Sequence, residues 1–392
     1  MEGHERVMLG SSNYLGLAAH PGVISAAHAA LSQYGTALNG SRLMNGTVDL
    51  HTELEAELAE WLGTEDALVF ASGYNANVGL LSAILSEADV VVCDSANHAS
   101  ILDGVALSGA RLMPFRHGRV DRLERLLSRR VAPGGGLLVA VDSIFSMRGD
   151  VADLPRIASV CRDTGATLVV DEAHAIGVLG RDGAGVVGEL GVGGETHLRV
   201  GTLSKALAGA GGFVAGDRPV IDTLRVKARS FLFTASAVPA ALGAALAALR
   251  ICRSPEGAEL RGRLIENAEY LRKGVSATGL STVEPSRIGE RDLVTPIVPV
   301  VIGHSYYAVL LWKALYDRGV YTDVALYPAT SKNGALIRLS VMATHTRQHL
   351  DQALEALAHV VKESEELHEQ AATVEAFIGR VVRGGEPLRS TG

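Results

Sequence analysis

Seven short apolar runs follow one another between residues 67 and 216, with amphipathic stretches between them. Most runs are continuous rather than alternating, which is typical of strands buried on both faces of a parallel sheet. The intervening patterns are helical; residues 154–165, for example, end at Gly165, a common helix C-cap. Together they predict a three-layer α/β domain with a mainly parallel seven-stranded sheet between helices. The expected strands are 67–71, 90–94, 111–115, 137–142, 167–171, 198–202 and 212–216.

The pattern changes toward the C-terminal end of the chain. Residues 235–280 are strongly helical in pattern, and after Thr295 an apolar run, a helix, a second apolar run and a charged helix follow one another. This order predicts a second, smaller α+β domain. We expect three parts: an N-terminal segment at 1–36, a large domain at 37–255 and a small C-terminal domain at 256–392.

Charge and composition argue against several classes of protein. The formal net charge is −7 and no basic stripe is visible, so we expect no nucleic-acid partner. No apolar run reaches the ~18 residues of a membrane span, and the first residues lack the pattern of a signal peptide. Cys93, Cys161 and Cys252 lie far apart, without metal or disulfide spacing. We therefore expect a cytoplasmic protein with no metal site.

Candidate functional residues stand where the predicted strands end. In open α/β sheets, ligands bind at the carboxyl ends of the strands. Glycine, polar and charged residues follow most of the predicted strands at these positions. They are Gly73 and Tyr74 after the first strand, His98 after the second, Asp142 after the fourth, Asp171 and His174 after the fifth, and Lys205 after the sixth.

Lys205 lies in the segment GTLSKALAGAGG, residues 201–212. Its small neighbours would let a large planar ligand approach the backbone, and Thr202 and Ser204 offer hydroxyls to a phosphate. Desolvation in such a pocket makes an amine easier to deprotonate, which a Schiff-base lysine requires. The alternative is an ordinary loop lysine that reaches into water.

The segment VVDEAHAIG, residues 169–177, places Asp171 at a strand end and His174 three residues later. A buried carboxylate needs a cationic partner, and a protonated pyridine nitrogen is a suitable one. Keeping that nitrogen protonated makes the ring an electron sink, and His174 could hydrogen-bond the phenolic oxygen of such a cofactor. The alternative for Asp171 is capping of the next turn. DEAH also occurs in helicases, but the phosphate loop that they need is absent from this sequence.

Two further segments suit the same cofactor. In SGYNAN, residues 72–77, Gly73 and the backbone N–H groups of a helix start form a phosphate cradle, to which Tyr74 could add a hydroxyl. In DSANHASI, residues 94–101, the flat ring of His98 could stack on a pyridine, although a lone histidine is more often structural. The four segments, each after a different strand of one sheet, together predict a pyridoxal 5'-phosphate site.

Longer motifs carry a resemblance to a known family. They are TLSKALAGAG around the lysine, NYLGLAAHP, GSRLMNGTVDLHTELEAELAEWLG, FSMRGDVADL, FLFTASAVP, ALYPAT and IRLSVMATHT. From about residue 8 to 360 the chain resembles the α-oxoamine synthases, which are pyridoxal-phosphate-dependent transferases of fold type I. Bacterial serine palmitoyltransferases and 8-amino-7-oxononanoate synthases are the members that look most similar.

The resemblance implies a role for each candidate residue. Lys205 would form the Schiff base and later move the α-proton of the substrate. The residues that hold the cofactor would be Gly73, Tyr74, His98, Ser146, Asp171, His174, Thr202 and Ser204, with Thr234 reaching the phosphate from a partner subunit. The residues that bind the substrate would be Ser12, Asn13 and Arg338, whose planar guanidinium suits a carboxylate.

The implied activity is that of a C-acyltransferase. It would condense an amino acid with an acyl thioester, carried by coenzyme A or a carrier protein, and release carbon dioxide to leave an α-amino ketone. The resemblance also implies a homodimer with shared active sites. Glycine, alanine and serine stay open as the amino acid. The alternatives are another reaction of the same fold, such as that of an aminotransferase or aldolase, or a non-catalytic partner subunit.

Three departures from the family pattern bear on the substrates. The chain begins only a few residues before NYLGL, so the usual N-terminal segment is short, and a carrier-protein donor is the hypothesis that this suggests. Asp142 stands where many relatives have glutamate, and Ser12 stands where several have asparagine or tyrosine.

Overall fold

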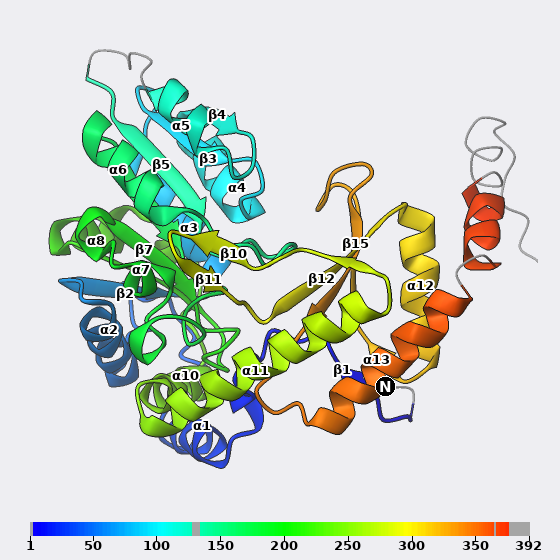
Figure 1. Cartoon of the computed structure of the whole chain (residues 1–392). Coiled ribbons are helices and arrows are strands. Elements are labelled where there is room, and N and C mark those ends of the chain that lie inside the picture. Colours follow the sequence, from blue (N-terminus) through cyan, green and yellow to red (C-terminus); the bar gives the residue numbers. More distant parts are fainter. Residues whose placement is uncertain (1–2, 128–133, 364–365, 376–392) are drawn as a thin grey trace, which may run out of the picture.

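The computed structural model describes residues 3–127, 134–363 and 366–375. Its largest element is a seven-stranded sheet in the order β2-β8-β7-β6-β5-β3-β4, in which β8 is antiparallel to both neighbours and the other pairs are parallel (Figure 1). The prediction is confirmed, with only the first strand displaced by one residue. The strands are β2 (Asp66–Phe70), β3 (Val90–Asp94), β4 (Arg111–Phe115), β5 (Leu137–Asp142), β6 (Thr167–Asp171), β7 (Leu198–Thr202) and β8 (Gly212–Gly216).

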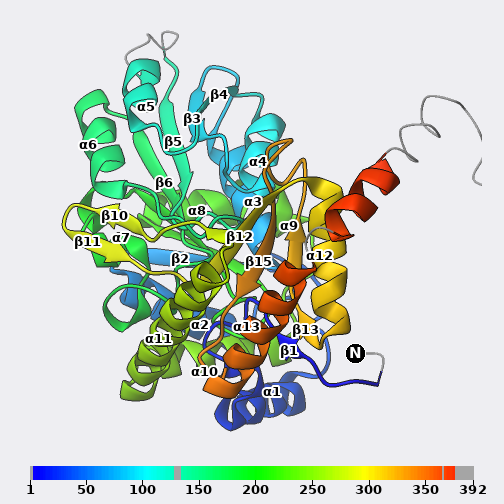
Figure 2. The same cartoon turned by 45° about the vertical axis from the view of Figure 1, so that its right-hand side comes forward.

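Helices cover both faces of this sheet, because alternate strand residues point to opposite sides (Figures 1 and 2). In β2, Leu68 and Phe70 belong to one hydrophobic cluster, whereas Ala67 and Val69 belong to the other. The first cluster includes α3 (Gly73–Ile84), α4 (Ala99–Ser108), α8 (Arg218–Lys227) and α9 (Arg229–Leu232). The second includes α2 (Asp49–Leu62), α5 (Val120–Leu127), α6 (Leu154–Thr164), α7 (Val186–Leu190) and α10 (Pro239–Cys252).

Strand β4 departs from the expectation that the strands are buried on both faces. It is the last strand of the sheet, and Leu112 is 37% exposed. Pro114 has no N–H to donate to a further strand, which suits an edge position. The sequence predicts the strand at 111–115, but its place at the edge depends on the order of strands.

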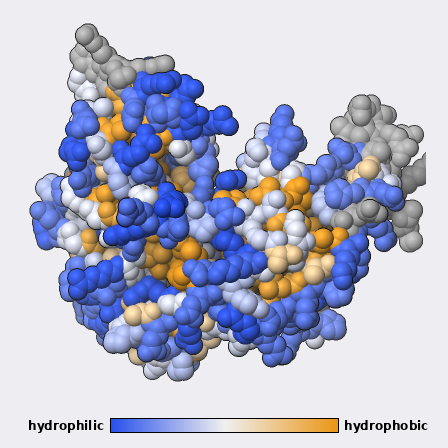
Figure 3. All heavy atoms as spheres, viewed as in Figure 1, coloured by the Kyte–Doolittle hydropathy of each residue, from blue (hydrophilic) through white to orange (hydrophobic). Residues whose placement is uncertain are grey.

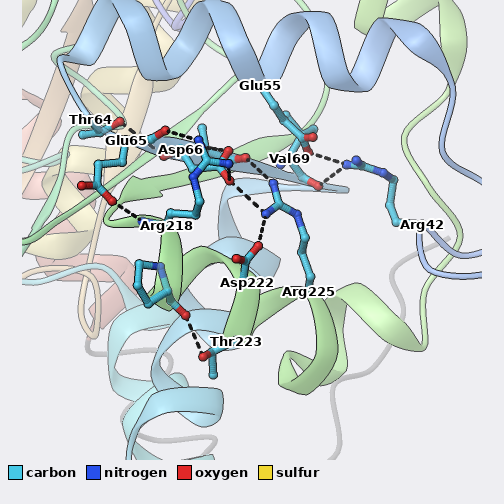
Figure 4. Close-up of polar contacts among 12 residues, drawn as sticks. Arg42, Glu55, Thr64, Glu65, Asp66, Val69, Arg218, Asp222, Thr223 and Arg225 are labelled. Carbon is cyan, nitrogen blue, oxygen red and sulfur yellow. Dashed lines mark hydrogen bonds and ion pairs between the residues drawn. The ribbon is translucent and has the colours of Figure 1, made fainter.

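The opposite edge of the sheet, β2, is closed by an ion pair (Figure 4). Glu55 of α2 accepts the backbone N–H of Val69 at 2.8 Å, and Arg42 donates to the Val69 carbonyl at 3.0 Å and to Glu55 at 2.8 Å. On the other side of β2, Arg225 of α8 binds Asp66 at 2.9 Å. The bonds at Val69 satisfy backbone groups that an edge strand would otherwise leave open for pairing with another strand.

A smaller antiparallel sheet in the order β14-β15-β12-β9 confirms the second α+β unit. Its strands are β9 (Ser281–Thr282), β12 (Ile297–Gly303), β14 (Asp323–Ala325) and β15 (Ala335–Ser340). The elements around it are α11 (Pro255–Ala277), α12 (Ser305–Asp317), α13 (Arg347–Lys362) and the hairpin of β10 (Ser286–Ile288) and β11 (Arg291–Leu293). Figure 3 shows apolar groups at the surface over β12 and α12, where Val301 is 40% and Val309 is 37% exposed.

The N-terminal segment contacts both units. Strand β1 (Val7–Met8) pairs with β13 (Val320–Tyr321), whereas α1 (Pro21–Tyr34) packs on α10. Between them, the backbone N–H of Ala343 donates to the Tyr14 carbonyl at 2.7 Å. This path lays residues 9–14 between the two sheets. The division into 1–36, 37–255 and 256–392 stays a prediction, and residues 376–392 lie outside the described part of the chain.

Within the described ranges, no helix is long and apolar enough to cross a membrane. The same ranges hold no group of three or more histidine, cysteine, aspartate and glutamate side chains arranged to bind a metal.

Candidate active site

A cavity of about 220 Å³ lies at the carboxyl ends of the large sheet's parallel strands, and predicted residues from several segments line it. The predicted residues in its wall are Gly73, Tyr74, His98, Ser146, Asp171, His174, Thr202, Ser204 and Lys205. The wall also contains residues that the sequence did not single out for the site, namely Ser72, Asn77, Ser100, Ile144, Ala173 and Gly201, together with the strand-end Asp142.

Lys205 lies in the loop of residues 203–211 between β7 and β8. The Thr202 hydroxyl donates to the Gly211 carbonyl at 3.0 Å and lies 2.7 Å from the Ser204 hydroxyl. Burial lowers the pKa of the Lys205 amine, and the carboxylate of Asp171 opposes this shift. The amine is therefore easier to deprotonate than one in water, which favours its use as a nucleophile or base.

Asp171 ends β6 and is 7% exposed. Its Oδ2 accepts from the Asn77 amide at 2.6 Å, and its Oδ1 accepts from the backbone N–H of Ala173 at 2.8 Å. Both donors are neutral, so these bonds orient the carboxylate without neutralising it. A cationic group in the cavity would complete the pairing that a buried carboxylate needs.

His98 is connected to the same network. Asn77 also donates to the Ser100 hydroxyl at 2.9 Å, and that hydroxyl lies 2.7 Å from Nδ1 of His98. Burial lowers the pKa of the His98 ring, so the ring is neutral at neutral pH. The backbone N–H of His98 donates to Asp142 at 2.9 Å, which fixes the start of α4 beside the cavity. His98 is thus placed as a flat, uncharged wall.

His174 is 9% exposed, and the Tyr14 hydroxyl lies 2.7 Å from its Nδ1. Arg338, which can only donate, lies 3.4 Å from the same hydroxyl and leaves the Tyr14 proton available to Nδ1. In the tautomer that accepts this proton, His174 carries its own proton on Nε2. Burial, followed by the charge of Lys205, holds the pKa of His174 well below its usual value. The ring is a neutral donor.

Two glycines let the start of α3 lie against the turn after β7. A Cβ on Gly73 would lie 3.1 Å from the Thr202 Cβ, and one on Gly212 would lie 2.4 Å from the Gly73 Cα. The close approach brings the free N–H groups of the helix start beside the hydroxyls of Thr202 and Ser204, as an anion site requires. The hydroxyl of Tyr74 donates to Asp103, so its proton is not offered to an anion there.

The remaining predicted residues do not line this cavity. Arg338 is 8% exposed on β15 and is connected to His174 of the cavity wall through the Tyr14 hydroxyl. Ser12 lies 3.4 Å from Arg338, whereas the Asn13 side chain accepts from the backbone of Ala18 at 3.2 Å. Thr234 lies between α9 and α10, outside the cavity wall.

Asp142 differs from the other carboxylate. It is 5% exposed, and its Oδ1 has no hydrogen-bond partner in the described structure. Burial, followed by the negative charge of Asp171, raises the pKa of Asp142 well above its usual value. The buried Oδ1 of Asn77 also has no partner among the described residues.

These features fit pyridoxal phosphate. The cavity combines an amine of lowered pKa, a buried aspartate, a neutral histidine wall, a second neutral imidazole and a glycine-lined anion cradle. The side-chain oxygens of Asn77 and Asp142 that have no hydrogen-bond partner among the described residues leave the cavity wall with polar groups that a ligand could bind.

Comparison with known proteins agrees with this geometry. The family model of aminotransferase class I and II matches residues 5–357. An 8-amino-7-oxononanoate synthase of Geobacter sulfurreducens is 42% identical over 92% of this chain and 90% of its own, and a serine palmitoyltransferase of Sphingobacterium spiritivorum is 39% identical over 93% and 89%.

Solved structures give the same answer. A serine palmitoyltransferase of Sphingomonas wittichii has a TM-score of 0.87 and 34% identity over 93% of this chain and 89% of its own. A second structure of that kind, equal in both measures, was solved with pyridoxal phosphate bound. The chain therefore belongs to the aminotransferase class I and II family and, within it, to the α-oxoamine synthases, which depend on pyridoxal phosphate.

Proposed function

We propose that this protein condenses an amino acid with an acyl thioester, releases carbon dioxide and leaves an α-amino ketone. One observation carries the proposal: an amine of lowered pKa, Lys205, shares a cavity with the buried side chain of Asp171 at the sheet position that the family's motif predicts. The named activities of the relatives, an oxononanoate synthase and serine palmitoyltransferases, support the same reaction class. When bound, pyridoxal phosphate supplies an electron sink for the bonds broken at the α-carbon.

The chain's own residues would bind and orient the cofactor. Lys205 would hold it covalently, Asp171 would keep the pyridine nitrogen protonated, and His98 would lie against the ring. The Nε2 proton of His174 would be donated to the phenolic oxygen. The residues of the phosphate cradle would be Gly73, Thr202 and Ser204, with the backbone at Tyr74.

Positioning of the amino acid would fall to Arg338, with Ser12 and Asn13 nearby. The cofactor ring weakens only the substrate bond that stands perpendicular to it. The way in which Arg338 binds the carboxylate would therefore select the bond that breaks. The freed Lys205 amine would take the α-proton, and the hydroxyl of Ser146, in the cavity wall, would lie near the acyl carbonyl.

A homodimer would complete the site, with Thr234 reaching the phosphate of the partner. Apolar side chains beside Thr234 are exposed to an unusual degree: Phe233 by 75% and Met44 by 81%. The two segments are joined by the bond from the Ser236 N–H to the Gly40 carbonyl, at 3.0 Å. Exposed apolar groups gathered in this way favour a subunit interface.

Two alternatives differ in their products. An aminotransferase or aldolase of this fold would release neither carbon dioxide nor a free thiol in response to a thioester. A non-catalytic partner subunit would have no use for Lys205 and Asp171, both of which are in place. Glycine, alanine and serine, and a coenzyme A or carrier-protein donor, are the substrates to compare. A cytoplasmic location stays a prediction; the three cysteines of the sequence are free and buried.

The test is an absorption titration of the purified protein with glycine, alanine and serine, beside Lys205→Ala. We expect a visible band from bound pyridoxal phosphate, shifted by one of the amino acids and altered in the variant. Addition of acyl-coenzyme A or acyl-carrier protein should then release carbon dioxide and thiol together. A protein that stays colourless with added cofactor would overturn the proposal.

A further inference from the structure

Arg338 is paired with a carboxylate of its own chain. Asp323 of β14 and Arg338 of β15 are register partners in the small sheet, and Oδ2 of Asp323 lies 3.3 Å from Nη1 of Arg338. The side chains are 34% and 10% exposed, respectively. Register partners on neighbouring antiparallel strands project from the same face, so the sheet itself places the two charges together.

The other N–H groups of Arg338 have no hydrogen-bond partner or only distant ones. Its Nε is buried and has no partner in the described structure, and its Nη2 makes only long contacts of 3.4 Å with Ser12 and Tyr14. A guanidinium presents paired donors that match the two oxygens of a carboxylate. An arriving carboxylate would therefore meet the Nε and Nη2 edge, while Asp323 keeps Nη1.

Asp323 is packed in place beside Arg338. A Cβ on Gly10 would lie 3.0 Å from Oδ1 of Asp323 and 2.6 Å from the Tyr321 ring, so the N-terminal segment lies closely over this strand. Asp323 also lines a second cavity of about 370 Å³, whose wall includes Arg338 and Met147, the neighbour of Ser146. The carboxylate thus lies beside Arg338, in the wall of a cavity next to the place where the amino acid would be held.

The proposed reaction makes this pairing meaningful. When the bond to the carboxylate breaks, carbon dioxide leaves without charge and the electron pair stays on the substrate. Arg338 then loses the anion that it held. A buried cation without a partner is costly, but Asp323 would remain beside it. Before the bond breaks, the same charge weakens the hold of Arg338 on the substrate.

We infer that Asp323 is a positioning residue that balances the charge of Arg338, so that the amino-acid carboxylate is held weakly and released as carbon dioxide. The inference rests on the proposed function. It differs from a purely structural role, because removal of the charge should tighten substrate binding while it slows one chemical step. Interactions stronger in the ground state than in the transition state lower KM and kcat together.

The experiment compares Asp323→Asn with the wild type, both loaded with pyridoxal phosphate. Alanine and alaninamide, which has a neutral amide in place of the carboxylate, are titrated by visible absorption. We expect the preference for alanine over alaninamide to rise about tenfold in the variant, or about 1.4 kcal/mol. Release of carbon dioxide should slow, whereas exchange of the α-proton with deuterated solvent should not.

Glu189→Gln is the matched control, because it removes a partly exposed carboxylate that lies 3.2 Å from Arg291, away from the cavity. Its preference for alanine should equal that of the wild type. An unchanged preference in Asp323→Asn, with a normal cofactor band, would overturn this inference alone. A missing band in the wild type would instead overturn the proposed function.

A second measurement needs no variant and covers the case in which Asp323→Asn does not fold. The wild type should prefer alanine over alaninamide by no more than about tenfold, since the net charge of the pair is near zero. A preference of a thousandfold would mean that Arg338 acts as an unbalanced cation, and would also overturn the inference.

Discussion

The hydroxyl of Tyr14 lies 2.7 Å from Nδ1 of His174, across 160 residues of sequence. Tyr14 is fully buried, and burial raises the pKa of its hydroxyl, so it stays protonated at neutral pH. Because Arg338 donates to the same oxygen, the contact joins the predicted carboxylate site to the predicted cofactor site. The N-terminal segment thereby contacts the candidate active site.

Replacement of Tyr14 by phenylalanine should weaken cofactor binding. The change leaves Nδ1 of His174 without its donor, and an unpaired buried acceptor costs about 1–3 kcal/mol. The Nε2 tautomer would no longer be favoured. We expect the Kd for pyridoxal phosphate, measured by absorption, to rise about tenfold. Tyr306→Phe, on α12, serves as the control; equal effects in both variants would contradict the role of Tyr14.

Asn77→Leu should disturb two site residues at once. The Asn77 amide donates to Asp171 at 2.6 Å and to the Ser100 hydroxyl at 2.9 Å. Leucine has a similar volume but no hydrogen-bond donor. One oxygen of Asp171 therefore loses its partner, and the Ser100 hydroxyl that contacts His98 is no longer held in place. We expect about 1–3 kcal/mol lower unfolding free energy and at least tenfold weaker cofactor binding. Denaturant unfolding and absorption titration measure the two; a loss of stability with unchanged cofactor affinity would contradict this reading.

Local pattern was enough to predict most of the fold. Buried strands such as 90–94 and 137–142 were bounded correctly, because a run of apolar residues between polar turns has a length that only a strand fits. The exposure of β4 was missed because strand order is decided by packing between distant segments. The same is true of β1, whose partner lies over 300 residues away.

The sequence predicts residues whose side-chain chemistry itself suggests a role in the candidate site. It does not predict the residues that contact them from distant parts of the chain. Asp171 at a strand end, and His174 and Lys205 shortly after strand ends, are predicted from the sequence and line the same cavity. Asn77 and Tyr14 stand in quoted motifs, yet nothing local indicates that they contact Asp171 and His174. The pairing of Asp323 with Arg338 depends on strand register, which a single sequence does not specify.

Gly212→Ala should test the anion cradle. The new Cβ would lie 2.4 Å from the Cα of Gly73 and 2.5 Å from its backbone N, and backbone atoms cannot turn aside as a flexible side chain can. The start of α3 must then move away from Thr202. We expect a loss of at least 1–3 kcal/mol in unfolding free energy and weaker binding of inorganic phosphate, measured by calorimetry. Gly262→Ala lies in the interior of α11, where a Cβ meets nothing within 4 Å, and should leave phosphate binding unchanged without lowering the unfolding free energy.

Stability at alkaline pH should depend on His117. Its Nδ1 lies 3.0 Å from Asp94 and its Nε2 lies 2.7 Å from Asp150. Burial alone would lower the pKa of His117, but these two carboxylates raise it to about 9. Asp150 belongs to the loop after β5 that carries Ser146, and the Gly149 carbonyl of that loop accepts from Thr295 at 2.7 Å. The charged ring therefore anchors a segment of the cavity wall.

The sign of the pH effect follows from the direction of this shift. Because the folded-state pKa lies above the unfolded value of about 6.5, the stabilisation is fully present below pH 6.5 and is lost as the pH rises through about 9. Its size is on the order of 3 kcal/mol. Denaturant unfolding of the wild type and His117→Gln between pH 6 and 10 should show a gap that closes as the pH rises. Glutamine carries no positive charge, so the difference in unfolding free energy that comes from charge must shrink as His117 loses its proton. A difference that is independent of pH would mean that the shape of His117, and not its charge, stabilises the fold.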